Sequence, residues 1–199
     1  NNAIGNCALY GNIDGCYNNA LGHQSLYSTT SGDYNNAIGR ETLRTNTTGC
    51  HNNAVGYRAL YSNTIGYDNT ALGQCALYTN TEGNYNTAIG TSALKANTTA
   101  QDNTAIGNGA LMSNTTGYQN IAVGDGAMSL NTLGYQNAAL GSGALQFNKT
   151  GTSNQAIGYR ALNSNDRGGG NTALGWCALA KNIMGCYNHA IGYGSLQNS

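Results

Sequence analysis

Six cysteines are the residues of this chain with the widest chemical range, and their spacing is regular. Cys7 and Cys16 are nine residues apart, and Cys177 and Cys186 repeat the same separation. An even number of cysteines with a recurring spacing is typical of disulfides in an oxidising compartment. The sequence therefore predicts the disulfides Cys7–Cys16 and Cys177–Cys186, with free thiols as the alternative.

The remaining cysteines, Cys50 and Cys75, have no partner at that spacing, and their state stays open. One way to satisfy them is contact with another chain. A metal site is the least favoured alternative because no C-x-x-C spacing occurs and because His23, His51 and His189 share no common spacing with each other. We therefore predict no metal.

Acid–base catalysis finds little support in the carboxylates. Glu41 and Glu82 are the only glutamates, and neither has a partner carboxylate at a recurring offset. The run Gly168–Gly170 is followed by Asn171 in a turn-like context, so it does not resemble a phosphate-binding loop that opens a helix. The sequence predicts no enzyme, no catalytic residue and no cofactor.

Tyrosines form two files in which members are separated by 17 residues or a multiple of it. Their rings have flat apolar faces and a hydroxyl, which suit stacking on sugars or on another protein. We take them as candidates for glycan or surface binding, while the alternative is that they only cover the edges of a thin rod. The first file is Tyr10, Tyr27, Tyr61 and Tyr78. The second is Tyr17, Tyr34, Tyr85 and Tyr187, of which the first three are the binding candidates.

A file of threonines has the same spacing, and most of its members follow a serine or threonine two residues earlier. This double file is similar to the ice-binding face of β-solenoid antifreeze proteins, which makes ice binding the main alternative function. The other interpretation is that threonine is a good outward-facing strand residue. The file is Thr30, Thr47, Thr64, Thr81, Thr98, Thr115 and Thr132.

One tandem repeat of 17 residues accounts for all these spacings. Counted from Asn1, every seventeenth residue is Asn as far as Asn188, and the register never slips. Within the repeat, position three is always Ala, position four is Ile, Leu or Val, position five is Gly, and position nine is Leu or Met. We expect one repeat domain over residues 1–199, with eleven full coils and a partial twelfth, cut from a longer array.

The residue types of the repeat favour short strands joined by corners. Gly and Asn are poor helix formers, and 17 residues are too few for a helical hairpin with its turns. Gly supplies positive φ at corners, and Asn tolerates that region and can bond to the neighbouring backbone. The predicted fold is all-β, a parallel β-solenoid or β-roll. We also expect the Asn residues at positions one and twelve to form two hydrogen-bonded ladders between coils.

The apolar pairs of the repeat predict more than one chain. Neighbouring strand residues point to opposite faces, so positions three and four, and likewise eight and nine, should not both point into one coil. The simplest explanation is that one column fills the interior and the other packs on a partner, in a homotrimer or filament. The alternative is a corner that bends both residues inward in a monomer. The interface candidates are Ile4, Leu21, Ile38, Val55, Leu72, Ile89 and Ile106.

The segments Asn86–Gly90 and Asn52–Gly56, each followed three residues later by Ala, resemble the A-[IV]-G-x-x-[AS] repeats in the heads of trimeric autotransporter adhesins. The longer stretch Asn52–Gly66, NNAVGYRALYSNTIG, resembles arrays in phage tail-fibre proteins and related surface fibres. The resemblance covers the whole chain and implies a β-roll with three chains side by side. It also implies a structural and adhesive fibre that binds a receptor or glycan.

Composition agrees with a fibre and argues against other partners. Only 8% of the residues are charged, the formal net charge is zero and proline is absent, whereas globular domains carry about 25% charged residues. Without a basic patch or a long apolar run we expect neither nucleic-acid binding nor membrane insertion. We expect an extracellular localisation, on a virion or a cell surface. Four N-x-T sequons, at Asn46, Asn97, Asn114 and Asn148, matter only if the host glycosylates secreted proteins.

Overall fold

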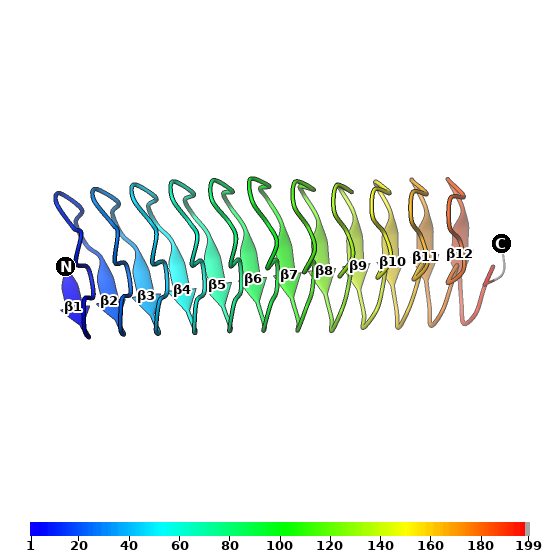
Figure 1. The fold of residues 1–199 in the computed structure, drawn as a ribbon. Coiled ribbons are helices and arrows are strands. Elements are labelled where there is room, and N and C mark those ends of the chain that lie inside the picture. The colour runs from blue at the N-terminus through cyan, green and yellow to red at the C-terminus, as the bar shows by residue number, and fades with distance from the viewer. Residues whose placement is uncertain (198–199) are drawn as a thin grey trace.

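The computed structural model describes residues 1–197 and shows a rod of stacked coils with the first and last strands at opposite ends (Figure 1). Each coil contributes one strand of three residues to a single 12-stranded parallel sheet. The strands are β1 (Asn2–Ile4), β2 (Asn19–Leu21), β3 (Asn36–Ile38), β4 (Asn53–Val55), β5 (Thr70–Leu72), β6 (Thr87–Ile89), β7 (Thr104–Ile106), β8 (Ile121–Val123), β9 (Ala138–Leu140), β10 (Gln155–Ile157), β11 (Thr172–Leu174) and β12 (His189–Ile191).

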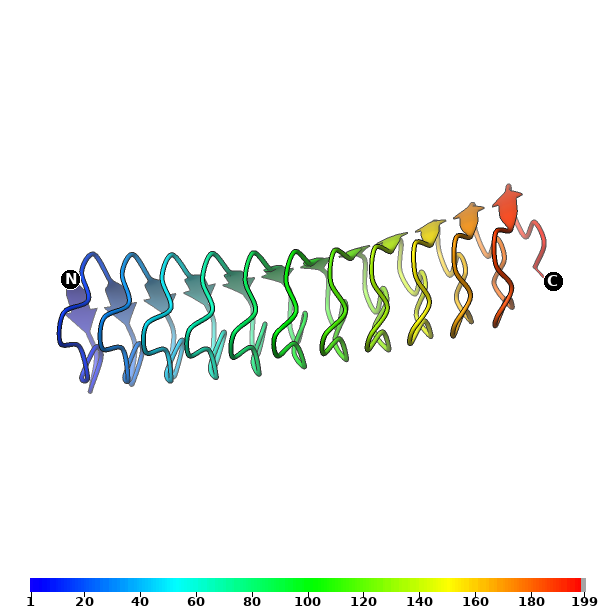
Figure 2. The ribbon, with the colours of Figure 1, turned by 90° about the horizontal axis from the view of Figure 1, so that it is seen from above.

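The sheet has the simplest possible topology, because spatial order follows chain order from β1 to β12. Each residue pairs with the same repeat position in the next coil, as Ala20, Ala37 and Ala54 do. Figure 2 shows the strands along one side of the rod, and this side turns gradually from β1 to β12. The predicted all-β parallel solenoid of 17-residue coils is therefore confirmed.

Outside the strands, each coil consists of turns that still hydrogen-bond to their neighbours. Leu60 N–H donates to the carbonyl of Ala76 at 2.9 Å, and Ser62 N–H donates to that of Tyr78 at 3.0 Å. On the other side of the coil, Arg58 N–H donates to the carbonyl of Arg40 in the preceding coil at 3.1 Å. Backbone hydrogen bonds thus link coils all round the rod, although only positions two to four are strands.

Alanine and leucine fill the narrow interior. In β5, Ala71 is buried while Leu72 on the same strand is 45% exposed, as expected for alternating strand residues. Ala76 and Leu77, at positions eight and nine, are both fully buried. The prediction that this second pair would split between two faces is wrong, because the segment is a turn and not a strand.

The residue at position nine, Leu or Met, adopts a left-handed backbone conformation in every coil, for example φ 51° at Leu77 and 50° at Leu94. A left-handed residue with a Cβ costs roughly 1–2 kcal/mol. Full burial of a leucine side chain contributes about 1.5–3 kcal/mol, which offsets that cost. The conformation turns the chain so that two consecutive apolar residues reach the interior.

Asparagines form the two predicted ladders, which are confirmed. At position one, Asn69 Nδ2 donates to Oδ1 of Asn52 in the preceding coil at 3.1 Å. At position twelve, Asn63 Nδ2 donates to Asn46 Oδ1 at 2.8 Å. These asparagines are buried and have negative φ, so they act through their amides and not through a left-handed corner.

Both ladders meet at the carbonyl of position fifteen. Gly66 O accepts Asn52 Nδ2 at 2.8 Å and Asn63 Nδ2 at 2.9 Å. A Cβ on Gly66 would overlap the Oδ1 of Asn63 and lie 2.6 Å from the carbonyl oxygen of Gly83 in the next coil. Glycine is needed here for space, and Gly73 at position five is needed both for its φ of 139° and because a Cβ would lie 2.5 Å from the carbonyl oxygen of Gly90.

Candidate functional site

The outer face of the sheet carries a continuous apolar column formed by position four. Most members are exposed, for example Leu21 at 46% and Leu140 at 49%, and none is fully buried. Val55, Ile89 and Val123 are half-buried. All seven predicted interface residues lie in this column, at the last residue of their strands. The alternative in which a corner bends positions three and four inward together is wrong, because position three alone points into the coil.

The first tyrosine file is a continuous stack along the rod. Tyr10 stacks on Tyr27 with ring centroids 5.3 Å apart, and Tyr61 stacks on Tyr78 at 5.2 Å. Arg44 fills the gap in the file, with its guanidinium 5.3 Å from the Tyr27 ring and 5.8 Å from the Tyr61 ring. Because the rings face one another, they offer edges and hydroxyls outward and do not offer the open faces expected for sugar stacking.

The second tyrosine file is stacked only near its start. Tyr17 stacks on Tyr34 at 4.8 Å, and Tyr34 stacks on His51 at 5.0 Å. Tyr85 lies further along the file and meets Tyr67 edge to face at 5.2 Å. A hydrogen bond with Tyr67 raises the pKa of Tyr85. These rings are exposed at a corner of the coil and remain surface candidates.

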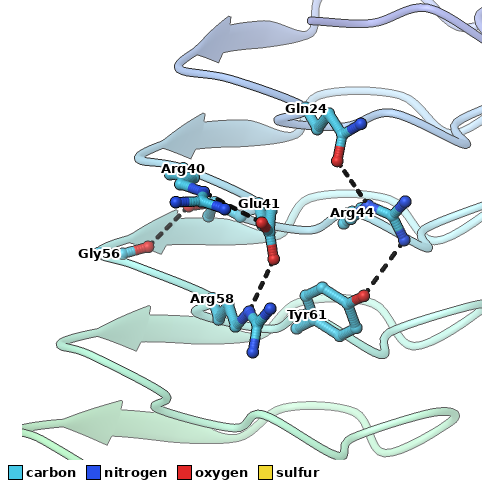
Figure 3. A network of polar contacts seen from close by, with 8 residues as sticks. Gln24, Arg40, Glu41, Arg44, Gly56, Arg58 and Tyr61 are labelled. Carbon is cyan, nitrogen blue, oxygen red and sulfur yellow. Dashed lines mark hydrogen bonds and ion pairs between the residues drawn. The ribbon is translucent and has the colours of Figure 1, made fainter. Parts of the chain in front are cut away.

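A polar network of arginines and Glu41 lies next to Tyr61 of the first tyrosine file (Figure 3). Glu41 is buried, and its carboxylate accepts from Arg58 Nε at 2.7 Å and from Arg40 Nε at 3.0 Å. The hydrogen bond from Arg58 lowers the pKa of Glu41, and Arg40 adds to the effect. Arg44 donates from Nε to Gln24 Oε1 at 3.0 Å and from Nη1 to the Tyr61 hydroxyl at 3.2 Å.

Sequence reasoning missed this network as a site. Arg40, Arg44 and Arg58 occupy three different repeat positions, so they form no file in the sequence. The available signal was that Arg44 interrupts the tyrosine file at a position where its guanidinium can stack between two rings.

The threonine file is tied into the backbone of the rod. Thr47 Oγ1 donates to the carbonyl of Thr64 at 2.9 Å, and Thr64 Oγ1 donates to that of Thr81 at 3.0 Å. Thr45, two residues before Thr47, likewise donates to the carbonyl of Tyr61 at 2.9 Å. All seven threonines of the file make this bond and are half-buried in a turn, not on a strand face.

The predicted disulfides Cys7–Cys16 and Cys177–Cys186 are absent, because all six cysteines are free thiols. Position sixteen lies at the outer corner of the coil, where Cys16 Sγ lies 3.3 Å from the carbonyl oxygen of Asp14. At position seven, Cys7 is half-buried and Cys177 is buried. No group of three or more His, Cys, Asp or Glu side chains within residues 1–197 could hold a metal ion.

The four sequon asparagines belong to the buried ladder at position twelve. Asn46, Asn97, Asn114 and Asn148 are each fully buried. All four side-chain amides donate to the carbonyl at position fifteen, and those of Asn97, Asn114 and Asn148 also donate to the Asn Oδ1 of the preceding coil. A glycan on these nitrogens is incompatible with the folded coil.

Comparison of the chain with protein-family models, with curated proteins and with solved structures gave no match. Residues 1–197 contain no helix of the length and apolarity that a membrane crossing requires.

Proposed function

We propose that this chain is a structural and adhesive segment of an extracellular fibre, such as a phage tail fibre or a surface adhesin. In this proposal, copies of the rod associate side by side through the apolar column at position four. The fibre lies on a virion or cell surface and places a receptor-binding or glycan-binding region at a distance from it. The chain has no enzymatic role, no cofactor, no nucleic-acid partner and no membrane insertion.

The observation that carries the proposal is the apolar column of Ile, Leu and Val on the outer face of the sheet. Solvated positions of the same corner vary freely, as Asn6, His23 and Arg40 at position six do. Position four stays apolar in all twelve strands. A contiguous apolar strip on a soluble rod is typical of an interaction surface.

Identical rods are the best partners for such a strip. Every coil places Ile, Leu or Val at position four on the outer face of the sheet, so copies in register pack these columns against one another along their length. Closed rotational symmetry is the usual arrangement of identical subunits. Three copies agree with the resemblance to trimeric autotransporter heads and satisfy every column within one closed fibre.

Two other functions have weaker support. Ice binding through the Ser/Thr-x-Thr file is the first, but its hydroxyl protons are donated to backbone carbonyls of the next coil. A purely structural filament without a ligand is the second, and it shares the assembly through position four.

Mass in solution combined with an electron-microscopy image tests the proposal. We expect a rod with the mass of three chains. A monomer at micromolar concentration would contradict the fibre assembly, and thermal hysteresis shown by such a monomer would favour ice binding instead.

A further inference from the structure

Three of the eight basic side chains gather in two neighbouring coils. Arg40 and Arg44 belong to the third coil and Arg58 to the fourth. Within residues 1–197, Glu41 is the only carboxylate paired with them, so three positive charges meet one negative charge in a chain with zero net charge. The cluster therefore carries an excess of positive charge.

The three guanidinium groups are held in fixed positions by shared partners. Arg40 and Arg58 bind the same Glu41 carboxylate and lie 5.8 and 5.0 Å from the Tyr57 ring. Arg44 and Arg58 share the Tyr61 ring, at 5.8 and 5.3 Å. A binding site whose side chains are already ordered loses less entropy when a ligand arrives.

Most of the donors in this cluster are unused. Within residues 1–197, the side-chain hydrogen bonds of Arg40 and Arg58 use only Nε, which leaves their Nη groups for a ligand. Figure 3 shows the Nη atoms of Arg58 directed away from Glu41. Gln24 accepts from Arg44 through Oε1, so its amide nitrogen is also a donor that the network does not use. Guanidinium groups bind carboxylates through two parallel N–H bonds.

The aromatic rings decide which kind of anion fits. Single-stranded nucleic acids bind through base stacking on open aromatic faces. Here the Tyr27 and Tyr61 faces are covered by Arg44, and Tyr61 also stacks on Tyr78. The rings contribute edges and phenolic hydroxyls, which suit a ligand with many hydroxyl groups.

We propose that Arg40, Arg44 and Arg58, with Gln24 and the tyrosine hydroxyls, form a binding site for a carboxylate-bearing saccharide. The sugar carboxylate binds the Nη groups of the arginines, while the sugar hydroxyls bind Gln24 and the tyrosines. This site specifies the ligand class of the adhesive function proposed above and rests on that function.

The chain provides a matched control at Arg160. The pair Tyr159 and Arg160 repeats Tyr57 and Arg58 at the same repeat positions, with Arg160 5.3 Å from the Tyr159 ring. The positions that correspond to Arg40 and Arg44 are Ser142 and Gln146, so Arg160 is a single guanidinium without a cluster.

Isothermal titration with oligogalacturonate, its neutral carboxyl-reduced form and polyglutamate tests the site. The wild-type rod should bind oligogalacturonate and not the reduced form. The double variant Arg44→Gln/Arg58→Gln should weaken binding roughly tenfold or more, as expected for lost charge-assisted hydrogen bonds. Arg160→Gln should change affinity by less than about twofold. Arg58→Lys should restore only part of the affinity because Lys lacks the paired N–H donors.

Three results would overturn the site: no binding of oligogalacturonate, equal weakening by Arg160→Gln, or polyglutamate binding as tight as that of oligogalacturonate, which would indicate an acidic peptide. Circular dichroism checks that the variants fold, and Arg58→Gln leaves Glu41 paired with Arg40. Mass in solution reports assembly separately. A trimer that binds no acidic sugar contradicts this inference alone, whereas a monomer that binds it contradicts only the assembly.

Discussion

Asn12 and Thr29 hold the same position in adjacent coils, and each buries a side-chain oxygen that forms no hydrogen bond. From Asn63 to Asn182 this position is Asn, whose amide donates to the Asn Oδ1 of the coil before. Thr29 has no amide to donate, so the ladder is interrupted between Asn12 and Asn46.

Thr29→Asn should therefore stabilise the rod. It provides the missing donor to Asn12 Oδ1 and removes the orphaned Thr29 hydroxyl, and each unsatisfied buried group costs about 1–3 kcal/mol. We expect a gain in the free energy of unfolding of about 1–2 kcal/mol, measured by thermal or urea unfolding. The reverse change in an intact ladder, Asn80→Thr, should lower stability by a similar amount. An unchanged Tm for Thr29→Asn would contradict this account.

Ala100 occupies the position that is Gly in every other coil that contains it, and Ala100→Gly should stabilise the chain. Around Gly49, the amides of Thr48 and Gly49 both donate to Thr64 O, at 3.2 and 3.3 Å. In the coil that contains Ala100, all of whose residues the structure describes, Thr98 N–H donates to Thr115 O at 3.2 Å. The amides of Thr99 and Ala100 make no corresponding bond.

The neighbouring ladder contact, from Asn114 Nδ2 to Asn97 Oδ1, is also long at 3.2 Å. Removing the Cβ should restore these bonds and raise the free energy of unfolding by about 1 kcal/mol, in the range of a net backbone hydrogen bond. Gly83→Ala, one coil earlier, is the control and should lower stability. If both variants shift the Tm in the same direction, the steric explanation is wrong.

Glu41 should make stability depend on pH in the acid range. Its pKa is lowered from 4.5 by the hydrogen bond from Arg58, so the stabilisation is present above that ordinary value. It is lost as the pH falls through the folded-state pKa. The Tm difference between wild type and Glu41→Gln should be largest near neutral pH and should shrink below pH 4.5. Glu82→Gln, at an exposed position, should show no such trend. A Glu41→Gln difference that stays constant with pH would argue against the ion pairs.

Charges placed in the apolar column should separate the subunits without unfolding them. Leu72→Lys with Ile106→Lys introduces two charges at exposed positions of β5 and β7. The folded monomer tolerates them, whereas a subunit interface would bury unpaired charges. Light scattering should show a change from trimer to monomer, with unchanged circular dichroism. The control Gln74→Lys adds one charge at position six and should leave the trimer intact; dissociation by this control would place the interface elsewhere.

Six thiols should react with a thiol reagent in denaturant without any reductant, because all six cysteines lie within the described residues 1–197 and are free. Mass spectrometry after alkylation counts them. If only two of the six cysteines are labelled, the result would support the disulfides Cys7–Cys16 and Cys177–Cys186. In the native rod, the exposed Cys16 and Cys186 should react faster than the buried Cys177.

The repeat length, the parallel solenoid and both Asn ladders could be predicted from the sequence. This was possible because stacking places each residue next to its own repeat position, so periodicity along the chain directly becomes contact in space. Asn52 and Asn69 are neighbours because they are 17 residues, one coil, apart.

Contacts between residues at different repeat positions, within one coil or between coils, could not be predicted from the sequence and are known only from the tertiary structure. The sequence alone determined which residues line up along the rod, and the path of the backbone around one coil determined where they point. The left-handed φ at Leu77 turns both Ala76 and Leu77 inward, which strand alternation cannot indicate. The same backbone path keeps Cys7 from bonding to Cys16. It also brings Arg40, Arg44 and Arg58 together from three repeat positions. The physical reason is that side-chain direction depends on dihedral angles, which the periodicity of the sequence does not encode.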